Sequence, residues 1–421
     1  MSLFAAATAV RAASPENPST TLGNPARWLV DLFGGTSDAG VSVNEATSLK
    51  YSAVWNATTI ISSDIATLPI DIFEKDKSGD KKEIPDHDLS RLLNHSPNEQ
   101  MSAPAFRQAG MVHNLLWGNM YAGIVRNGSG KPASLLLLHP AHTYPEVSQG
   151  RLRYISRMLL NGDNISLEIK PSDMIHVPGL TTDGITGLSV IGHARNAIGL
   201  GLAMEKFGSK FFSNGANLSG VIEHPGTFKD AESKKNFAKS WHDVYSGTDN
   251  ALKTAVLEMG MTYKNIGIPP NDAQFLDSRK FGINEIARWF NIPEYKLGSL
   301  DRATFNNIEH MAIDYVVRTI VPRLKFIKSE FERKLFTERE KIAGRYSIEF
   351  NINALLEGSI ETKGRFIDLM IKNGVYNIND GRGFLNMNKV PGGDRHFIQR
   401  DKMPLDRYDD FVDRTVFPTN V

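Results

Sequence analysis

Apolar residues recur at helical spacing in the first regular part of the chain, between residues 50 and 70. They stand three or four positions apart and stop at Pro69, because proline cannot continue a helix. The next residues, Ile70 to Glu74, predict a strand that ends in the turn-prone sequence KSGDKK. The apolar positions of the predicted helix are Val54, Ala57, Ile61, Ile65 and Leu68.

The following stretch combines one helix with several short strands. Ser102 is placed to cap a helix that continues to Trp117, and Gly118 is placed to end it. A strand from Met120 to Val125 then runs into the turn NGSGKP, and short alternating strands continue as far as His176. Strands joined by tight turns, with helices beside them, predict an α+β domain with an antiparallel or mixed sheet.

Longer helices dominate the middle of the chain. Ser189 can cap a helix to about Asn214, and a second helix is predicted over 271–290. Residues 220–270 between them hold a short charged helix around Trp241 and strands with the sequences TAVLEM and TYKNI. We expect the two helices to form an up-and-down pair with this insert at one end. Their apolar positions are Ile191, Ala194, Ile198, Leu202 and Phe212, then Leu276, Ile283, Ala287 and Phe290.

A third helical segment is predicted from Thr304 to about Phe336. Pro322 lies within it and should kink it, because proline removes a backbone donor and clashes with the carbonyl four residues earlier. The strand SIEFNI, a helix over 360–372 and an irregular tail after Gly392 complete the pattern. The apolar positions of the third segment are Ile308, Ala312, Tyr315, Thr319, Leu324, Ile327, Phe331 and Leu335.

Composition narrows the class of protein. The 421 residues are 41% apolar, enough for two or three domains with real cores. A formal net charge of +1 argues against a free-standing nucleic-acid-binding protein, which usually concentrates Lys and Arg. The chain has no run of about 18 or more apolar residues, so no membrane-spanning helix is expected. The absence of Cys excludes disulfides and fits a reducing cytoplasm.

The first residues, MSLFAAATAVRAAS, lack the positive start of a signal peptide, so we expect a mobile tail. Residues 14–25 are rich in Pro, Ser and Asn and should form an extended arm.

Three motifs that suggest chemistry are incomplete. The sequence NGSGK lacks the flanking residues of a phosphate-binding loop, since Val125 and Pro132 stand where Gly and Ser or Thr are needed. The side chains of the neighbours Glu309 and His310 diverge on a helix, and the chain has no HExxH motif. Neither this pair nor the pair His139 and His142 therefore predicts a metal site. The segment 377–381 places Gly one position too early for a calcium loop, and a turn at a helix start is preferred.

Positive charge gathers between Arg318 and Arg345. Nine Lys or Arg stand against four Asp or Glu there, a net charge of 9 − 4 = +5. The run could face DNA or an acidic partner. A solvated helix face is at least as good an explanation, and we assign no DNA contact to it.

Several short motifs occur in an order that resembles one family. They cover roughly residues 45–400, and no single one is specific. Those motifs are SAVWNATTIISSDIATLP (52–69), SPN (96–98), GNMYA (118–122), GLTTDGITGLS (179–189), EKFGSKFFSNGANLSGVIE (205–223), AQFLDSRKFGINEIARWFNIPEYKLG (273–298), TFNN (304–307), EFN (349–351) and PGGD (391–394). Together they resemble the portal proteins of long-tailed bacteriophages. The chain departs from many relatives at Ile292-Pro293-Glu294 and at Asn306, which leaves local loop geometry open.

The resemblance implies a portal-type α+β fold with a wing, a two-helix stem, a β-containing clip, a long kinked helix and a helical crown. The implied divisions are a flexible N-terminal arm (1–44), wing (45–188), first stem helix (189–219), clip (220–270), second stem helix (271–292), tunnel loop (293–303), long helix with a wing strand (304–355), crown (356–394) and C-terminal tail (395–421).

The resemblance also implies a function. It predicts a DNA conduit in the virion, a ring of twelve subunits at one capsid vertex that is assembled in the host cytoplasm and has no catalytic residues, cofactor, metal or membrane partner. The implied partners are further copies of the chain, double-stranded DNA, the terminase large subunit, the major capsid protein and scaffold, and a head-tail adaptor. Another virion ring protein, such as a head-completion adaptor, is the alternative, and a DNA-processing enzyme is disfavoured.

The resemblance places candidate DNA contacts in the tunnel loop. Twelve copies of a weakly basic loop would surround DNA with shallow, equivalent contacts, which suits sliding. The alternative, that some of these residues pack one subunit against the next, stays open. The candidates are Tyr295, Lys296, Leu297, Gly298 and Arg302, with Lys280 and Arg288 on the preceding helix as weaker ones.

Overall fold

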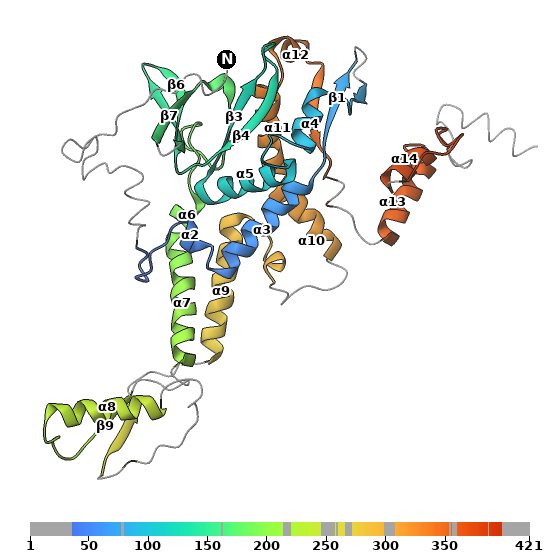
Figure 1. Cartoon of the computed structure of the whole chain (residues 1–421). Coiled ribbons are helices and arrows are strands. Elements are labelled where there is room, and N and C mark those ends of the chain that lie inside the picture. The colour runs from blue at the N-terminus through green and yellow to red at the C-terminus, as the bar shows by residue number, and fades with distance from the viewer. Residues whose placement is uncertain are drawn as a thin grey trace, which may run out of the picture. The chain divides into compact units, whose positions relative to one another are not determined.

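The computed structural model describes most of the chain between residues 36 and 397. The described ranges are 36–76, 80–160, 163–213, 220–245, 257, 260–265, 272–298, 308–352, 355, 360–385 and 387–397. The chain divides into two compact units, Met1–Ile352 and Asn353–Val421. Small antiparallel sheets and helices make up the described part of the first unit, and the described part of the second contains two helices (Figure 1). The predicted α+β class is confirmed.

The helices α3 (Ser52–Thr67) and α5 (Ala103–Trp117) pack against each other at the centre of the first unit. The five apolar positions predicted for α3 are all completely buried. The Ser102 hydroxyl accepts a hydrogen bond from the Ala105 amide at 3.4 Å, and Gly118 ends α5 with a φ of +76°. The predicted start and end of α5 are therefore confirmed.

Two three-stranded antiparallel sheets follow α5. One has the order β4-β3-β8 and the other β5-β6-β7, and buried side chains from both sheets form one apolar cluster that includes Tyr121, Tyr154 and Leu167. The turn between β3 and β4 is closed by Asn127, whose side-chain oxygen accepts from the amides of Ser129 and Lys131 at 3.0 Å each. The strands are β3 (Asn119–Arg126), β4 (Pro132–Leu138), β5 (Thr143–Ser148), β6 (Arg151–Leu160), β7 (Asp163–Ile169) and β8 (Met174–Pro178).

Two glycines, Gly118 and Gly187, let the loop before the long helices approach the end of α5 closely. A Cβ atom on Gly187 would overlap the carbonyl oxygen of Gly118, and one on Gly118 would overlap that of Leu188. The buried side chain of Asn119 completes this contact, because it donates to the Gly187 carbonyl and accepts from the Gly187 amide, both at 2.8 Å. Only glycine fits such an approach of two backbones.

A third sheet, with the order β11-β1-β2, lies beside α11. The strand β1 (Ile70–Lys75) pairs antiparallel with both β11 (Tyr346–Phe350) and β2 (Lys81–Glu83), so β1 and β11 bring together residues 272–280 positions apart. The short helix α4 (Asp88–Asn94) packs on β1. Both strands predicted here, Ile70 to Glu74 and SIEFNI, are confirmed.

The two predicted long helices lie side by side and run in opposite directions (Figure 1). They are α7 (Arg195–Ser213) and α9 (Asp272–Phe290). The first is shorter than predicted, because a separate turn, α6 (Val190–His193), precedes it and Ala194 breaks the helix. The sequence gives no signal for this break, since the buried residues Ile191, Ala194 and Ile198 keep helical spacing across it.

The insert between these helices is a helix on a two-stranded sheet. The helix is α8 (Ala231–Tyr245), and the strands are β9 (Gly220–Glu223) and β10 (Thr262–Asn265), paired antiparallel. The strand β10 coincides with the predicted TYKNI, whereas β9 was not assigned from the sequence. The TAVLEM strand lies outside the described residues except for Leu257.

The third long segment is not one bent α-helix. It consists of α10 (Ile308–Tyr315), a π-helical turn (Val316–Ile320) and α11 (Val321–Leu335), followed by α12 (Glu338–Ala343). The interruption predicted at Pro322 is present, but proline stands in the first turn of α11, directly after the π turn. The predicted interruption therefore takes the form of a π turn immediately before the proline.

The described part of the second unit contains α13 (Ile360–Lys372) and α14 (Ile378–Phe384). Asn377 caps α14 by accepting from the Asp380 amide at 2.8 Å, and the Asp380 carboxylate accepts from the Asn377 amide at 2.8 Å. The suspected calcium loop is thus the start of a helix, as preferred from the sequence.

The N-terminal arm is described only from Thr36 onward. Ser37 and Val43 are buried, and Ser37 packs on Gly199 of α7. The helix α2 (Glu45–Ser48) follows. Residues 36–44, which were expected to belong to a flexible arm, are therefore packed in the first unit. In the described residues, no helix is long and apolar enough to cross a membrane.

One buried cation joins the first helices of the unit. The Arg107 guanidinium on α5 donates to the carbonyl oxygens of Ala66 and Leu68 at the end of α3, and to that of Leu93 in α4. Burial lowers the pKa of Arg107 to about 10, so the group remains charged at neutral pH. The three carbonyls lie at helix ends, where no intrahelical donor is available.

We predict that Arg107→Met destabilises the protein by about 2–4 kcal/mol, because three buried carbonyls lose their charged donor. The matched control is Arg157→Met, which removes an exposed guanidinium that lies 5.7 Å from the Tyr144 ring. Urea unfolding followed by circular dichroism measures both variants. Equal stability of Arg107→Met and the parent would contradict the assigned role.

Candidate functional site

The predicted loop residues lie where the chain leaves α9. Asn291 ends the helix in the left-handed conformation, with a φ of +51°. Pro293 then starts a single 3₁₀ turn, Glu294–Leu297, which Gly298 ends with a φ of +91°. The chain is described again from Ile308, at the start of α10. The described part of the predicted tunnel loop is therefore a compact turn.

A proline determines the hydrogen bonding opposite this turn. Pro322 has no N–H group, so the carbonyl of Arg318, four residues earlier, loses its α-helical donor. The Asn291 side-chain amide donates to that carbonyl at 3.0 Å. The Val321 amide donates to the carbonyl of Val316, five residues earlier, which is the π-helical pattern.

Two further side chains fasten the same junction. The Thr319 hydroxyl, in the π turn, donates to the Asn291 carbonyl at 2.6 Å. The Arg323 guanidinium donates to the carbonyls of Thr319 at 2.5 Å and Phe290 at 2.7 Å. Its positive charge lies at the carbonyl end of α9, where the helix dipole favours a cation. Three of these hydrogen bonds thus join the end of α9 to the π turn and the start of α11, and the fourth, from Arg323 to Thr319, lies within that second segment.

Three of the candidate channel residues pack inside the subunit. The Tyr295 hydroxyl donates to the Met311 carbonyl of α10 at 3.0 Å, and Leu297 is only 9% exposed. The Lys296 ammonium lies 4.4 Å from the centre of the Tyr315 ring, a cation–π contact. The Lys296 carbonyl accepts from the Asn56 side chain of α3 at 3.5 Å. These contacts anchor the turn to α3 and α10.

Tyr315 links this turn to α3. Its hydroxyl donates to the Asp64 carboxylate at 2.7 Å. Burial, followed by the hydrogen bond to Asp64, raises the pKa of Tyr315 above its usual value, so the phenol stays protonated and remains a donor. The Tyr315 ring, which contacts the Lys296 ammonium, is therefore also fixed through its hydroxyl.

The other candidates lie elsewhere. Gly298 is exposed at the end of the 3₁₀ turn, and Arg302 lies outside the described residues. Lys280 and Arg288 are exposed on α9, and the Arg288 guanidinium lies 6.0 Å from the Phe281 ring. The fold therefore brings Tyr295, Lys296 and Leu297 together without the remaining candidates. Their DNA contacts stay predictions.

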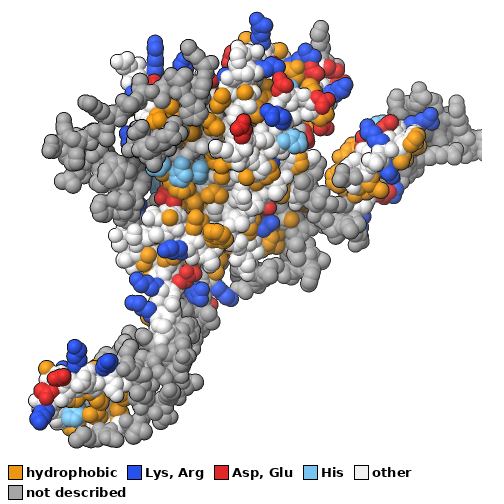
Figure 2. Space-filling view, in the orientation of Figure 1, with side chains coloured by type: hydrophobic (Ala, Val, Ile, Leu, Met, Phe, Trp, Pro, Cys, Tyr) orange, Lys and Arg blue, Asp and Glu red, His pale blue; other side chains and the backbone are white. Residues whose placement is uncertain are grey.

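Most cations of the basic run from Arg318 to Arg345 have partners within the subunit. Ion pairs at 2.6–2.7 Å join Arg318 to Asp314, Lys328 to Glu349, Arg333 to Glu330 and Lys341 to Glu338. Arg345 pairs with Glu74. On the face shown in Figure 2, Lys and Arg atoms are scattered rather than gathered in one patch. The run fits a structural role better than a DNA-binding surface.

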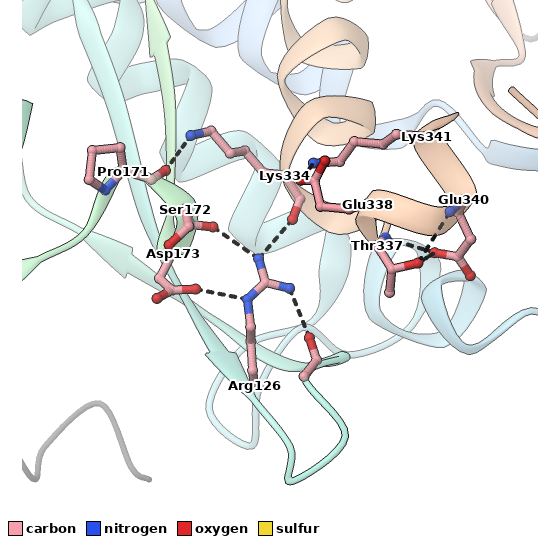
Figure 3. A network of polar contacts seen from close by, with 10 residues as sticks. Arg126, Pro171, Ser172, Asp173, Lys334, Thr337, Glu338, Glu340 and Lys341 are labelled. Atoms are coloured by element: carbon pink, nitrogen blue, oxygen red, sulfur yellow. Dashed lines mark hydrogen bonds and ion pairs between the residues drawn. The ribbon is translucent and has the colours of Figure 1, made fainter. Parts of the chain in front are cut away.

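One polar network ties the end of α11 to the sheets (Figure 3). Arg126 at the end of β3 donates to the Asp173 carboxylate at 2.8 Å and to the carbonyls of Ser172 and Lys334 at 2.9 Å each. The Lys334 ammonium in turn donates to the Pro171 carbonyl. This network occupies Lys334 of the basic run.

Sequence reasoning missed Asn291, Arg323 and the pair of Tyr315 and Asp64. A signal existed for the first, because Asn tolerates the left-handed conformation at a helix end, and Pro293 follows two residues later. No local pattern indicates the others. Asp64 and Tyr315 are 251 positions apart, and only the folded chain brings them together. Among the described residues, no cluster of His, Cys, Asp or Glu could hold a metal ion.

Comparison with known proteins gives a consistent result. Residues 52–386 match the model of a family described as "Phage portal protein". The chain is 29% identical to the portal protein of Enterobacteria phage HK97 over 86% of this chain and 85% of that protein. It is 30% identical to a "Probable portal protein" of Streptomyces phage phiC31, over 86% of this chain and 80% of that protein.

Solved structures share the fold. A chain in the virion of a native gene transfer agent has a TM-score of 0.55 and 19% identity, over 86% of this chain and 99% of that one. An HK97-family phage portal protein from Corynebacterium diphtheriae has a TM-score of 0.53 and 14% identity, over 74% of this chain and 96% of that one. The portal-type fold expected from the sequence is thereby confirmed.

We predict that Asn291→Ala destabilises the protein by about 1–3 kcal/mol, because it removes a hydrogen bond and because alanine adopts the left-handed conformation less readily than asparagine. Asn291→Gly keeps the conformation without the amide and should cost less. Urea unfolding distinguishes the two effects. If both variants were as stable as the parent, the hydrogen bond from the Asn291 side-chain amide to the Arg318 carbonyl would not stabilise the junction.

Proposed function

Because the chain belongs to the phage portal protein family, we propose that about twelve copies form a closed ring at one vertex of a capsid. Double-stranded DNA would enter and leave the head through the ring. Head-to-tail contacts that close by rotation generate rings, and a neck structure that shares this fold has C12 symmetry. We place the protein in the virion, after assembly in the host cytoplasm.

The observation that supports a conduit most directly is the family match across residues 52–386. The charge distribution agrees with it. The chain has a net charge of only +1, and the basic run of the long helix is largely paired within the subunit. A weakly charged wall would let DNA slide, whereas many free cations would hold the phosphates.

We propose that the channel-facing residues are fewer than the sequence suggested. Tyr295, Lys296 and Leu297 would anchor the base of the tunnel loop, since their side chains pack on α10 and within the subunit. Gly298 and Arg302 would belong to the projecting part, and Lys280 and Arg288 would be the stem candidates. The contacts that already occupy Tyr295, Lys296 and Leu297 support their placement at the base.

The proposed parts follow the order of the chain. Residues 45–188 would form the wing, α7 and α9 the stem, 220–270 the clip, and 356–394 the crown. We propose that the clip meets the terminase large subunit during packaging and a head-tail adaptor afterwards. The major capsid protein and scaffold would surround the ring. A head-completion adaptor is a weaker alternative, since that class does not account for the family match, and portal proteins are structural rather than enzymatic.

Electron microscopy of the purified full chain, with native mass measurement, tests the ring. We expect closed rings of about a dozen copies with an axial hole of about 20 Å or more, wide enough for duplex DNA. Filled heads that leak in the absence of this protein would favour an adaptor. Empty heads would favour the portal.

We predict that the double change Lys280→Gln and Arg288→Gln leaves rings intact and lowers the fraction of DNA-filled heads. Twelve copies would lose two cations each from the channel wall, which weakens phosphate contacts. Lys82→Gln, on the exposed strand β2 outside the proposed stem and clip, is the control. Counting filled heads measures the effect. Loss of ring formation would instead assign the two residues to the subunit interface.

A further inference from the structure

The two long helices leave an open apolar groove between them. It has a volume of about 500 Å³. Leu200 on α7 and Phe281 on α9 are 48% and 55% exposed along it, which is unusual for large apolar side chains that lie together. The groove is lined by Ala197, Leu200 and Met204 of α7 and by Asp277, Ser278, Phe281, Gly282 and Glu285 of α9.

The N-terminal arm begins its described part beside this groove. The Asp38 amide and carboxylate bond the Asn196 side chain at 3.2 and 2.7 Å, and Ser37 packs on Gly199. Asn196 directly precedes Ala197, and it shares a face of α7 with Leu200, four residues later. Residues 1–35 therefore join the described structure next to the apolar lining.

The part of the arm that precedes the described residues contains a compact apolar motif. Residues 24–35 read NPARWLVDLFGG. Asn followed by Pro is typical of a helix start, and Gly-Gly of a helix end. Within this frame Trp28, Leu29, Leu32 and Phe33 share one side at helical spacing. The sequence thus offers an amphipathic segment close along the chain to the exposed apolar lining.

Both the length of the connection from Thr36 and the charges beside the apolar motif allow this segment to reach the groove. Phe33 is three residues before Thr36 and Trp28 eight, so an extended chain would reach at most about 10 and 28 Å from Thr36. The lining from Ala197 to Met204 spans only about 10 Å along α7. Arg27 adjoins the apolar motif, and the carboxylates of Asp277 and Glu285 lie in the groove lining.

We propose that residues 24–34 of the arm dock in the groove between α7 and α9 of the same subunit. Trp28, Leu29, Leu32 and Phe33 cover Leu200 and Phe281, and Arg27 faces Asp277 and Glu285. The competing occupant is a second copy of the chain, which would cover the groove from outside. The short connection to Thr36 favours the subunit's own arm over a second copy.

Cysteine labelling of the full chain tests this, because the native sequence has no Cys. Leu200→Cys should react slowly with a soluble maleimide, and adding Trp28→Asp and Leu32→Asp should speed the reaction several-fold. Ile342→Cys, 86% exposed on α12, should react quickly in both backgrounds. An unchanged rate at Leu200→Cys after the arm substitutions would overturn the proposal, whether the groove is open or covered by a second copy.

A cross-link identifies which arm is bound. The pair Leu32→Cys and Leu200→Cys, treated with a bismaleimide, should give a linked species that migrates as a monomer in denaturing gels. The control pair Leu32→Cys and Ile342→Cys should not. A ladder of linked dimers and larger species would show that the arm binds a neighbouring subunit and would overturn the assignment to its own groove.

Discussion

The missing N–H of Pro322 is the constraint on which the junction of the long helices depends. It leaves the Arg318 carbonyl without a helical donor, and a π turn takes up the irregularity. Asn291 supplies the missing donor from the end of α9, and Thr319 returns a bond to Asn291. A local defect in one helix thus becomes the point at which another helix is attached.

The same junction determines which residues remain for function. Tyr295, Lys296 and Leu297 lie between the end of α9 and Gly298, and their contacts with α3 and α10 use the groups that could otherwise meet DNA. The charge of Lys296 lies over the Tyr315 ring, and the Tyr315 hydroxyl is bonded to Asp64. A basic residue in a predicted loop is therefore not by itself evidence for a phosphate contact.

The sequence predicted elements well where the signal is local. Ser102 and Gly118 gave both ends of α5, and the apolar spacing of α3 gave its buried face, because caps and periodicity act within one helix. The site was less predictable. Tyr315 and Asp64, which form a hydrogen bond there, are 251 positions apart in the sequence. The π turn accepts a hydrogen bond from Asn291, at the end of another helix. The break at Ala194 also has no local signal, since apolar spacing continues through it.

The anchoring of the 3₁₀ turn has a mechanical consequence for the proposed tunnel loop. The first part of the loop contacts Met311 and Tyr315 of α10. The helix α10 is also the first described element after the loop. Both ends of the loop are thus connected to one helix, and the π turn links that helix to α11. A force on the loop would reach α10 from both ends and meet the π turn next. The π turn is the first interruption of regular α-helical hydrogen bonding along that route.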